Sequence, residues 1–366
     1  MKITDVKAVS VEIDRGPTPY HDGGFVPPPN STAAYGYVEV FTDEGLTGFC
    51  PAAASPSTVE THLKPMLVGQ HPLEIEGNWQ RMFAGWRHPK MDDLMAISKV
   101  DIALWDLAGK IVGQPVWRLL GGARRHVKAY GAGGMYQEGK GVDALVAEMV
   151  DFVEHGFGAV KMKIGWEKVP MAEDVARIKA VREAIGPNVD LMIDVNHAWL
   201  PYQAIQFARM VEEYRPYWLE EPVDPWDYKG CAEVARALDI PVATGENVGS
   251  RYMWRDMIDA RACDIVQADA LYCGGFTEWR RIAAYAAANS LPMAPHGQPH
   301  VGAHCVGAVP NGLIVEVGMY AGRKPARPPM IAPLVVEKSY IDLGETPGMG
   351  WQIDRDAIKW NLERNS

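Results

Sequence analysis

The sequence contains few cysteines, no long apolar run and no excess of positive charge. Its five cysteines are scattered and include no C-x-x-C pair, so we expect free thiols in a reducing cytoplasm and no catalytic cysteine. No run approaches the length of a membrane span, and the N-terminus lacks the apolar core of a signal peptide. The formal net charge of −10 offers no basic field to nucleic acid or to an anionic membrane. These absences predict a cytoplasmic globular protein without nucleic-acid or membrane partners.

The first 123 residues have a mixed pattern of strands and helices. Three stretches alternate between apolar and polar residues as strands do: 2–13, 35–40 and 45–49. The segment from residue 57 to 120 then has helical spacing, most clearly over 92–112. A chain of 366 residues is long enough for one large domain and a smaller one. We therefore place a separate α+β unit at residues 1–123.

A long loop rich in proline and glycine separates the first two of these strands, at residues 14–31. Loops of this length are uncommon in compact domains unless they cover a site. Tyr20 and His21 are therefore candidate substrate-binding residues. An ordinary surface loop is the alternative interpretation.

After residue 123, short apolar runs alternate with helical segments. The runs, which we interpret as eight strands, end near residues 131, 163, 194, 220, 246, 269, 296 and 316. The helical segments are 171–185, 201–214, 229–238, 250–259 and 276–289. Repeated βα units predict a parallel sheet, and eight strands predict closure into a barrel at residues 124–322. The alternation stops in the tail, residues 323–366, which is expected to pack back against the first unit.

Acidic residues end three consecutive strands, at Asp194, Glu220 and Glu246, each 26 residues after the one before. A parallel barrel gathers its strand ends at one face, so three carboxylates would meet there without sulfur or histidine. Such a hard-oxygen set suits Mg²⁺, with Mn²⁺ as an alternative. Ion pairs with barrel lysines are the structural alternative, although burying even one ion costs several kcal/mol. The neighbours assigned to support these ligands are Asn196, Glu221 and Asn247, and Glu221 could exchange roles with Glu220.

Two lysines, Lys161 and Lys163, lie two positions apart on one predicted strand, so both point to the same face. Two neighbouring ammonium groups near a divalent cation lower one another's pKa, which would prepare one of them as a base at neutral pH. We assign Lys163 as this base and Lys161 as the group that binds a substrate carboxylate. A Lys163 amine that forms a Schiff base is the competing hypothesis.

Asp269 and His296 end successive strands, so a carboxylate and an imidazole can meet at the barrel mouth. The acid would fix the tautomer of the ring and raise its basicity, as a histidine acid/base requires. Glu316 ends the last strand and, if protonated, could donate a hydrogen bond to a substrate oxygen, or it could support the site indirectly. Three other histidines have no partner at barrel spacing and are given no role: His197, His300 and His304.

These groups suit the removal of a proton from the carbon next to a carboxylate. That step creates an enediolate, which is tolerable only where fixed positive charge meets it, as a metal and Lys161 would supply. Lys163 and His296 would carry protons on two sides of the carbon. If the second group returns the proton, the centre inverts; if it expels a β-hydroxyl, water leaves. The predicted partner is a small-molecule carboxylate, and a barrel that only binds such acids is the non-enzymatic alternative.

In combination, the motifs resemble those of the enolase superfamily and, within it, the mandelate racemase subgroup. They are K-x-K at 161–163, D-x-N at 194–196, E-E-P at 220–222 and G-E-N at 245–247, followed by the set Asp269, His296 and Glu316. A lysine in the place of Asp269 would indicate the muconate-lactonising subgroup instead. The resemblance covers nearly the whole chain.

The resemblance implies a modified TIM barrel, (β/α)7β, with an N-terminal α+β capping domain to which the tail returns. It also implies a Mg²⁺-dependent enzyme acting on a 2-hydroxy carboxylate. Similar proteins are most often acid-sugar dehydratases that yield a 2-keto-3-deoxy acid, and fewer are racemases or epimerases. The loop at about 16–30 would select the substrate, and a homo-oligomer is expected.

Overall fold

The capping domain is built on a three-stranded antiparallel sheet in the order β1-β2-β3. The computed structural model describes residues 1–14, 22–24, 27–28, 31–86, 90–318 and 327–364. The strands of this sheet are β1 (Ile3–Asp14), β2 (Thr32–Thr42) and β3 (Thr47–Cys50). Apolar residues on one face, such as Val38 and Val40, are fully buried, as alternation along a strand requires. The predicted β2–β3 hairpin is confirmed, and its turn passes through Gly45 at a φ of 83°, which favours glycine.

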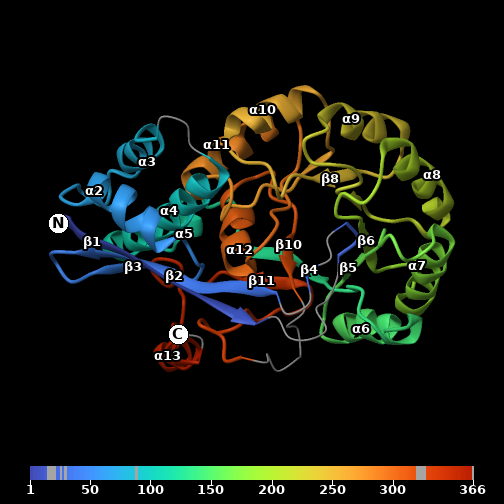
Figure 1. Ribbon diagram of the computed structural model, residues 1–366, viewed down its shortest axis with the longest axis horizontal. Coiled ribbons are helices and arrows are strands. Elements are labelled where there is room, and N and C mark those ends of the chain that lie inside the picture. Colours follow the sequence, from blue (N-terminus) through green and yellow to red (C-terminus); the bar gives the residue numbers. More distant parts are fainter. Residues whose placement is uncertain (15–21, 25–26, 29–30, 87–89, 319–326, 365–366) are drawn as a thin grey trace.

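Five helices complete this domain: α1 (Pro56–Thr58), α2 (Lys64–Leu67), α3 (Ile75–Ala84), α4 (Met91–Val112) and α5 (Val116–Leu119). A π-helical turn (Val59–Leu63) joins α1 to α2. The long helix α4 packs both on the sheet and on the barrel helix α11 (Gly275–Ala288). It ends at Gly113, which has a φ of 67° in a left-handed C-cap. The contact of α4 with α11 therefore joins the capping domain to the barrel (Figure 1).

The barrel strands run parallel in the order β10-β4-β5-β6-β7-β8-β9. They are β4 (His126–Ala132), β5 (Ala159–Lys163), β6 (Asp190–Asp194), β7 (Leu219–Glu220), β8 (Val242–Thr244), β9 (Ile265–Val266) and β10 (Val315–Val317). The predicted strand ending at 296 is reduced to a single bridging residue, Met293, which pairs with Val266 and Gly312 and closes the ring. Pro292 and Pro295 flank it and have no N–H to extend the ladder. The predicted fold class, a (β/α)7β barrel with an α+β capping domain, is confirmed.

Across the described residues, helices surround the barrel on its outer side (Figure 1). Besides α11 they are α6 (Val142–Glu154), α7 (Met171–Ile185), α8 (Pro201–Val211), α9 (Tyr228–Ala237), α10 (Arg251–Asp259) and α12 (Pro299–Ala308). The five helical segments predicted from the sequence are confirmed, whereas α6 and α12 were not among them. Helix α12 is buried from Val301 to Ala308, so no polar stripe marks it as a helix. In the described part of the chain, no helix combines the length and apolar character needed to cross a membrane.

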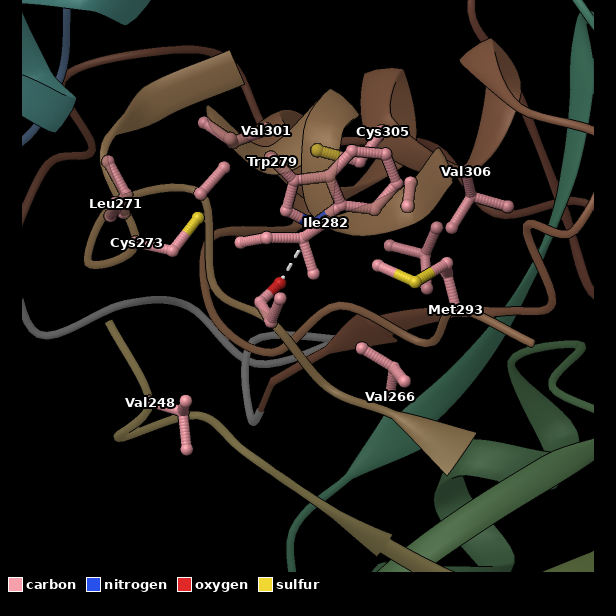
Figure 2. Packing of buried hydrophobic residues seen from close by; sticks show 14 of the residues in the cluster. Val248, Val266, Leu271, Cys273, Trp279, Ile282, Met293, Val301, Cys305 and Val306 are labelled. Carbon is pink, nitrogen blue, oxygen red and sulfur yellow. Dashed lines mark hydrogen bonds between the residues drawn. The ribbon is translucent and has the colours of Figure 1, made fainter. Parts of the chain in front are cut away.

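The barrel has one core inside the strand ring and another between the strands and the helices. The inner core alternates small with large side chains, among them Ala159, Met192, Trp218, Ala243 and Ile265. In the outer core, Val266 and Met293 pack beneath Trp279 and Ile282 of α11 and Val306 of α12 (Figure 2). The indole of Trp279 also donates a 2.9 Å hydrogen bond to the carbonyl of Ala268. Because each strand is packed on both sides, its carboxyl end is held firmly at the barrel mouth.

The tail contacts both the barrel and the capping domain. Strand β11 (Tyr340–Asp342) pairs antiparallel with β4. Helix α13 (Arg355–Glu363) then lies beside the capping sheet (Figure 1), where Ile358 packs in a cluster with Phe49 and Met330.

Candidate active site

The strand ends place four ionisable residues side by side. In the parallel ladder, Lys163 on β5 is paired with Asp194 on β6, which is paired with Glu220 on β7. Lys161 lies two residues before Lys163 and points to the same face. All four lie at the carboxyl end of the strands, where barrel enzymes place their active sites.

Lys161 is the central cation of this group and is only 1% exposed. Its Nζ donates to Glu220 Oε1 and lies 3.1 Å from Asp194 Oδ2 and 3.4 Å from Glu316 Oε1. Burial acts to lower the pKa of Lys161, but Glu220 and Glu316 raise it well above its ordinary value. Lys161 therefore carries a fixed positive charge that joins three strands.

Lys163 is held by a second set of oxygens. Its Nζ lies 2.6 Å from Asp194 Oδ2, 2.8 Å from Asn196 Oδ1 and 3.4 Å from Asp22 Oδ1. Burial acts to lower the pKa of Lys163, but Asp194 and Asp22 raise it above its ordinary value and outweigh the repulsion from Lys161. Lys161 does act to lower the pKa of Lys163, as expected, but the nearby carboxylates have the larger effect among the protein's own groups. The expected effect of a divalent cation on this pKa stays a prediction.

The two carboxylates that share Lys161 differ in their surroundings. Burial disfavours the charged form of Asp194, yet Lys163 and Lys161 hold its pKa well below the ordinary value. Burial and the charge of Asp194 together raise the pKa of Glu220 to about 8. The Trp218 indole donates a 2.8 Å hydrogen bond to Glu220 Oε2. An excess of buried carboxylate over lysine thus remains at this edge of the barrel.

Glu221 lies at the centre of a polar network that Asn196 connects to Lys163. Asn196 Nδ2 donates to Glu221 Oε2 at 3.4 Å, and Asn247 Nδ2 donates to Glu221 Oε1 at 3.3 Å. His197 Nε2 lies 3.1 Å from Glu221 Oε2. Burial and the charge of Glu246 raise the pKa of Glu221 well above its ordinary value. Glu220, and not Glu221, contacts Lys161, and two of the predicted supporting residues, Asn196 and Asn247, contact the third, Glu221.

His197 was given no role from the sequence, and the structure brings it into this network. His197 lies in the turn after β6, where both Asn196 (φ 45°) and His197 (φ 65°) have left-handed backbone conformations. Glu221 has the same conformation (φ 42°) after the next strand. Such conformations are costly for residues other than glycine and concentrate at functional sites. No periodic signal in the sequence marks these turns.

His296 lies between two acids at the seventh strand position. Its Nδ1 is 3.0 Å from Asp269 Oδ2, and its Nε2 is 3.3 Å from Glu246 Oε2. The predicted contact of His296 with Asp269 is therefore present. Burial acts to lower the pKa of His296, but Glu246 and Asp269 raise it well above its ordinary value. The backbone N–H of Leu271 donates to Asp269 Oδ1 at 2.7 Å, which holds this carboxylate in place.

The three predicted metal ligands have the chemistry that Mg²⁺ prefers, since all are carboxylates at neighbouring strand ends. Within the residues that the structure describes, however, no three acidic, histidine or cysteine side chains converge enough to hold a metal ion. Asp194 and Glu220 share Lys161, whereas Glu246 contacts His296. Glu316 Oε2 is buried without a hydrogen-bond partner among the described residues. The donor types and backbone positions fit Mg²⁺, and the side chains would have to rearrange to meet at one ion.

Part of the long loop of the capping domain lies directly on the barrel strands. A side chain at Gly23 would come within 2.1 Å of the Ile164 carbonyl, and one at Gly24 within 1.8 Å of the Asn196 carbonyl. This close approach brings Asp22 to Lys163. The predicted substrate-binding residues Tyr20 and His21 lie outside the described residues.

Comparison with known proteins gives matches over both parts of the chain. Residues 28–121 match the model of the mandelate racemase / muconate lactonizing enzyme N-terminal domain, and residues 144–357 match that of the enolase C-terminal domain-like family. The chain is 32% identical to an arabinonate dehydratase of Saccharolobus solfataricus, over 87% of this chain and 88% of that protein. It is 33% identical to a D-galactarolactone cycloisomerase of Agrobacterium fabrum, over 98% of each. Three further relatives are named as dehydratases of other sugar acids.

Solved structures give the same result. An L-talarate/galactarate dehydratase mutant liganded with Mg and L-glucarate superposes with a TM-score of 0.87 at 29% identity, covering 98% of this chain and 91% of that one. The family models, the relatives and this structure agree with the motifs at the strand ends. The chain therefore belongs to the enolase superfamily, in its mandelate racemase subgroup.

Proposed function

We propose that the protein is a Mg²⁺-dependent dehydratase of a sugar acid, an aldonate or an aldarate. It would remove the proton next to the substrate carboxylate, form an enediolate and expel the β-hydroxyl to give a 2-keto-3-deoxy acid. The observation that carries this proposal is the pair of proton carriers at the barrel mouth. Lys163 lies at the end of β5, and His296 lies just after the bridging residue Met293. Along the shorter path around the barrel, two strands, β4 and β10, separate them.

Lys163 is the proposed base. Its Nζ is buried against Asp194 and reaches the mouth of the barrel, where the Asp22 carboxylate of the capping domain also lies. Once it has lost its proton, the amine would take the proton from the carbon next to the substrate carboxylate. The neighbouring acids would then stabilise the ammonium group that results.

His296 is the proposed acid for the second step. Contact with Asp269 fixes Nδ1 as the protonated nitrogen, so Nε2 faces the site and can deliver a proton to the departing hydroxyl. Glu246 contacts Nε2 at 3.3 Å and favours the charged, proton-bearing ring. Protonation of the leaving oxygen is what makes loss of water feasible at neutral pH.

Positive charge must meet the enediolate, and Lys161 would supply part of it by binding the substrate carboxylate. Mg²⁺ on Asp194, Glu220 and Glu246, or Mn²⁺ in its place, would neutralise these carboxylates and stabilise negative charge on the substrate oxygens. Glu316 Oε2 is buried without a partner among the described residues, so it could contact a substrate oxygen. The hydroxyl groups of a sugar acid would be met by polar residues of the capping loop, of which Asp22 is described.

Dehydration is favoured because several relatives are named as sugar-acid dehydratases. A cycloisomerase of a sugar-acid lactone is the second candidate, because a relative with that name matches 98% of this chain. Racemisation or epimerisation by the same two proton carriers is the third outcome. All three share the removal of the proton next to the carboxylate and differ in the step that follows.

Incubation of the purified protein with Mg²⁺ and a library of sugar acids tests the proposal. We expect one or more acids to give a 2-keto product that reacts with semicarbazide and has lost one water by mass. In D₂O, a product that keeps all its oxygens and exchanges one hydrogen for deuterium would instead indicate racemisation, and opening of an added sugar-acid lactone would indicate cycloisomerisation. EDTA should abolish turnover and Mg²⁺ should restore it. Trapping of the substrate on Lys163 by borohydride, with no effect of EDTA, would contradict the proposal.

A further inference from the structure

The turn that follows Asp269 is held by its own backbone. The N–H groups of Tyr272 and Cys273 donate to the Asp269 carbonyl at 3.0 and 2.9 Å, and the N–H of Leu271 donates to the Asp269 side chain. Leu271 and Cys273 lie on this turn at the edge of the outer core (Figure 2). The position of the Asp269 carboxylate, and through it the orientation of His296, therefore depends on the path of the turn at residues 270–275.

Side chains of the capping domain hold this turn from outside. Ser98 Oγ on α4 accepts a 2.8 Å hydrogen bond from Gly274 N, and the Trp79 indole donates to the Gly274 carbonyl at 2.7 Å. Asp101, also on α4, accepts from the backbone and the hydroxyl of Thr277 at 2.9 and 2.6 Å. These side chains are buried, so water cannot replace them.

Lys99, also on α4, contacts the same turn with a charged group, although the atom that it contacts is a neutral carbonyl oxygen. It is 4% exposed, and its Nζ donates at 2.9 Å to the neutral carbonyl of Leu271. No carboxylate of the described residues lies within 4.0 Å of it, and the Tyr272 ring lies 5.1 Å away. Burial lowers the pKa of Lys99 to about 8. Burying an ammonium group without an ion-pair partner costs several kcal/mol of folding free energy. An apolar side chain would join the two domains without this cost, so the lysine calls for another explanation.

We propose that Lys99 is a positioning residue for the Asp269–His296 pair, acting through the Leu271 peptide. Its ammonium group holds the Leu271 carbonyl, and the N–H of the same residue holds Asp269 Oδ1. A helix of the capping domain thus fixes the acid that orients the histidine. The consequence for catalysis rests on the proposed function, whereas the consequence for the turn does not.

Three variants test this inference. Lys99→Met removes the ammonium group at nearly the same length, and Lys99→Arg keeps both the charge and the donors. Lys110→Met is the control, because Lys110 lies on the same helix and its Nζ also donates to a carbonyl, that of Thr47, at 2.8 Å, besides an ion pair with Asp106 at 2.6 Å. Both contacts stay within the capping domain. If Lys99→Met does not fold, Lys99→Gln takes its place in both measurements below.

The first measurement is amide hydrogen exchange of the peptide covering residues 269–275, followed by mass spectrometry. We expect about tenfold faster exchange in Lys99→Met, recovery of protection in Lys99→Arg and no change in Lys110→Met, since a local opening follows the loss of its hydrogen bonds. This readout needs no substrate. Equal exchange in Lys99→Met and the unmutated protein overturns the proposal.

The second measurement is steady-state turnover of the substrate found in the sugar-acid library. We expect kcat to fall by about 10-fold to 100-fold in Lys99→Met with KM little changed, because a displaced acid/base group slows chemistry more than binding. Lys110→Met should keep the kcat of the unmutated protein. An unchanged kcat in Lys99→Met overturns the proposal even if the turn is loosened. If the unmutated protein turns over no sugar acid, the proposed function fails, and amide exchange alone decides whether Lys99 orders the turn.

Discussion

Lys163 and Asp194 are register partners on the neighbouring strands β5 and β6, and their side chains meet at 2.6 Å. The contact places the proposed base on the carboxylate that is also a proposed metal ligand. Asp22 of the capping domain approaches the same ammonium group to 3.4 Å. The proposed proton carrier, a proposed metal ligand and a residue of the long capping-domain loop thus share one corner of the barrel mouth.

Replacement of Lys163 by alanine should stop the chemistry and leave binding in place. We expect kcat to fall by about 10²-fold to 10⁴-fold, the usual contribution of a positioned base. Steady-state kinetics and calorimetric titration of the substrate separate the two effects. Lys168→Ala, at an exposed position beyond the same strand, is the control. A Lys163→Ala enzyme as active as this control would exclude Lys163 as the base.

Replacement of Asp269 by asparagine should remove the acid that fixes the tautomer of His296. We expect turnover to fall by about 10²-fold to 10⁴-fold with little loss of stability, because the amide is close to the carboxylate in size. Asp264→Asn is the control, since Asp264 lies just before β9 and accepts from the Val242 N–H at 2.9 Å, away from the histidine. Equal rates in the two variants would show that the contact of Asp269 with His296 has no part in the reaction.

Gly297 is a position where a methyl group should disturb the same pair. Its φ is 96°, and a Cβ there would lie 2.3 Å from Asp269 Oδ2. We expect Gly297→Ala to lower the free energy of unfolding by about 1–3 kcal/mol and to reduce kcat as the carboxylate moves. Urea denaturation and kinetics measure both. Gly141→Ala, at a φ of −79° with no atom within 4 Å of its Cβ, should change neither. Unaltered stability and turnover in Gly297→Ala would contradict the described geometry.

His304 should make the fold sensitive to acid. Burial lowers its pKa to about 3, and its Nδ1 accepts a hydrogen bond from the Trp117 N–H at 3.0 Å. Below about pH 6.5 the unfolded chain binds a proton that the folded chain does not, so this contribution to stability is lost as the pH falls. Between pH 6.5 and 5 the loss is about 2 kcal/mol.

Denaturation of the His304→Gln variant at pH 7 and pH 5 checks this prediction. The difference in unfolding free energy between the two pH values should be smaller in the variant than in the unmutated protein. His126→Gln is the control, because its side chain is 64% exposed. An identical pH dependence in His304→Gln and the unmutated protein would mean that the buried imidazole is not kept neutral by the fold.

Much of the fold could be predicted because barrel strands carry a simple signal. Most are short apolar runs closed by an ionisable residue, and Asp194, Glu220 and Glu246 recur at the length of one βα unit. The strand at Met293 is shorter than predicted because Pro292 and Pro295 cannot donate to a ladder. Helix α12 escaped prediction because burial on all sides removes the periodic pattern.

The site was predictable where it depends on strand ends and unpredictable where it depends on turns. The approach of Asp269 to His296 follows from two successive strands. The contacts of His197 with Glu221 and of Lys99 with Leu271 come from left-handed turns and from a domain contact, which have no period in the sequence. The effect of the carboxylates on the pKa of Lys163 could not be predicted, because it depends on the distances to several acids at once.

A crystal structure of the protein grown with Mg²⁺ and a bound sugar acid is the most direct test of the metal site on which the proposed chemistry rests. We predict one ion with oxygens of Asp194, Glu220 and Glu246 at about 2.1 Å, and the substrate carbon between Lys163 and His296. An ion held by other residues, or a sugar acid bound while Lys161 and Lys163 still join the carboxylates without any ion, would contradict it.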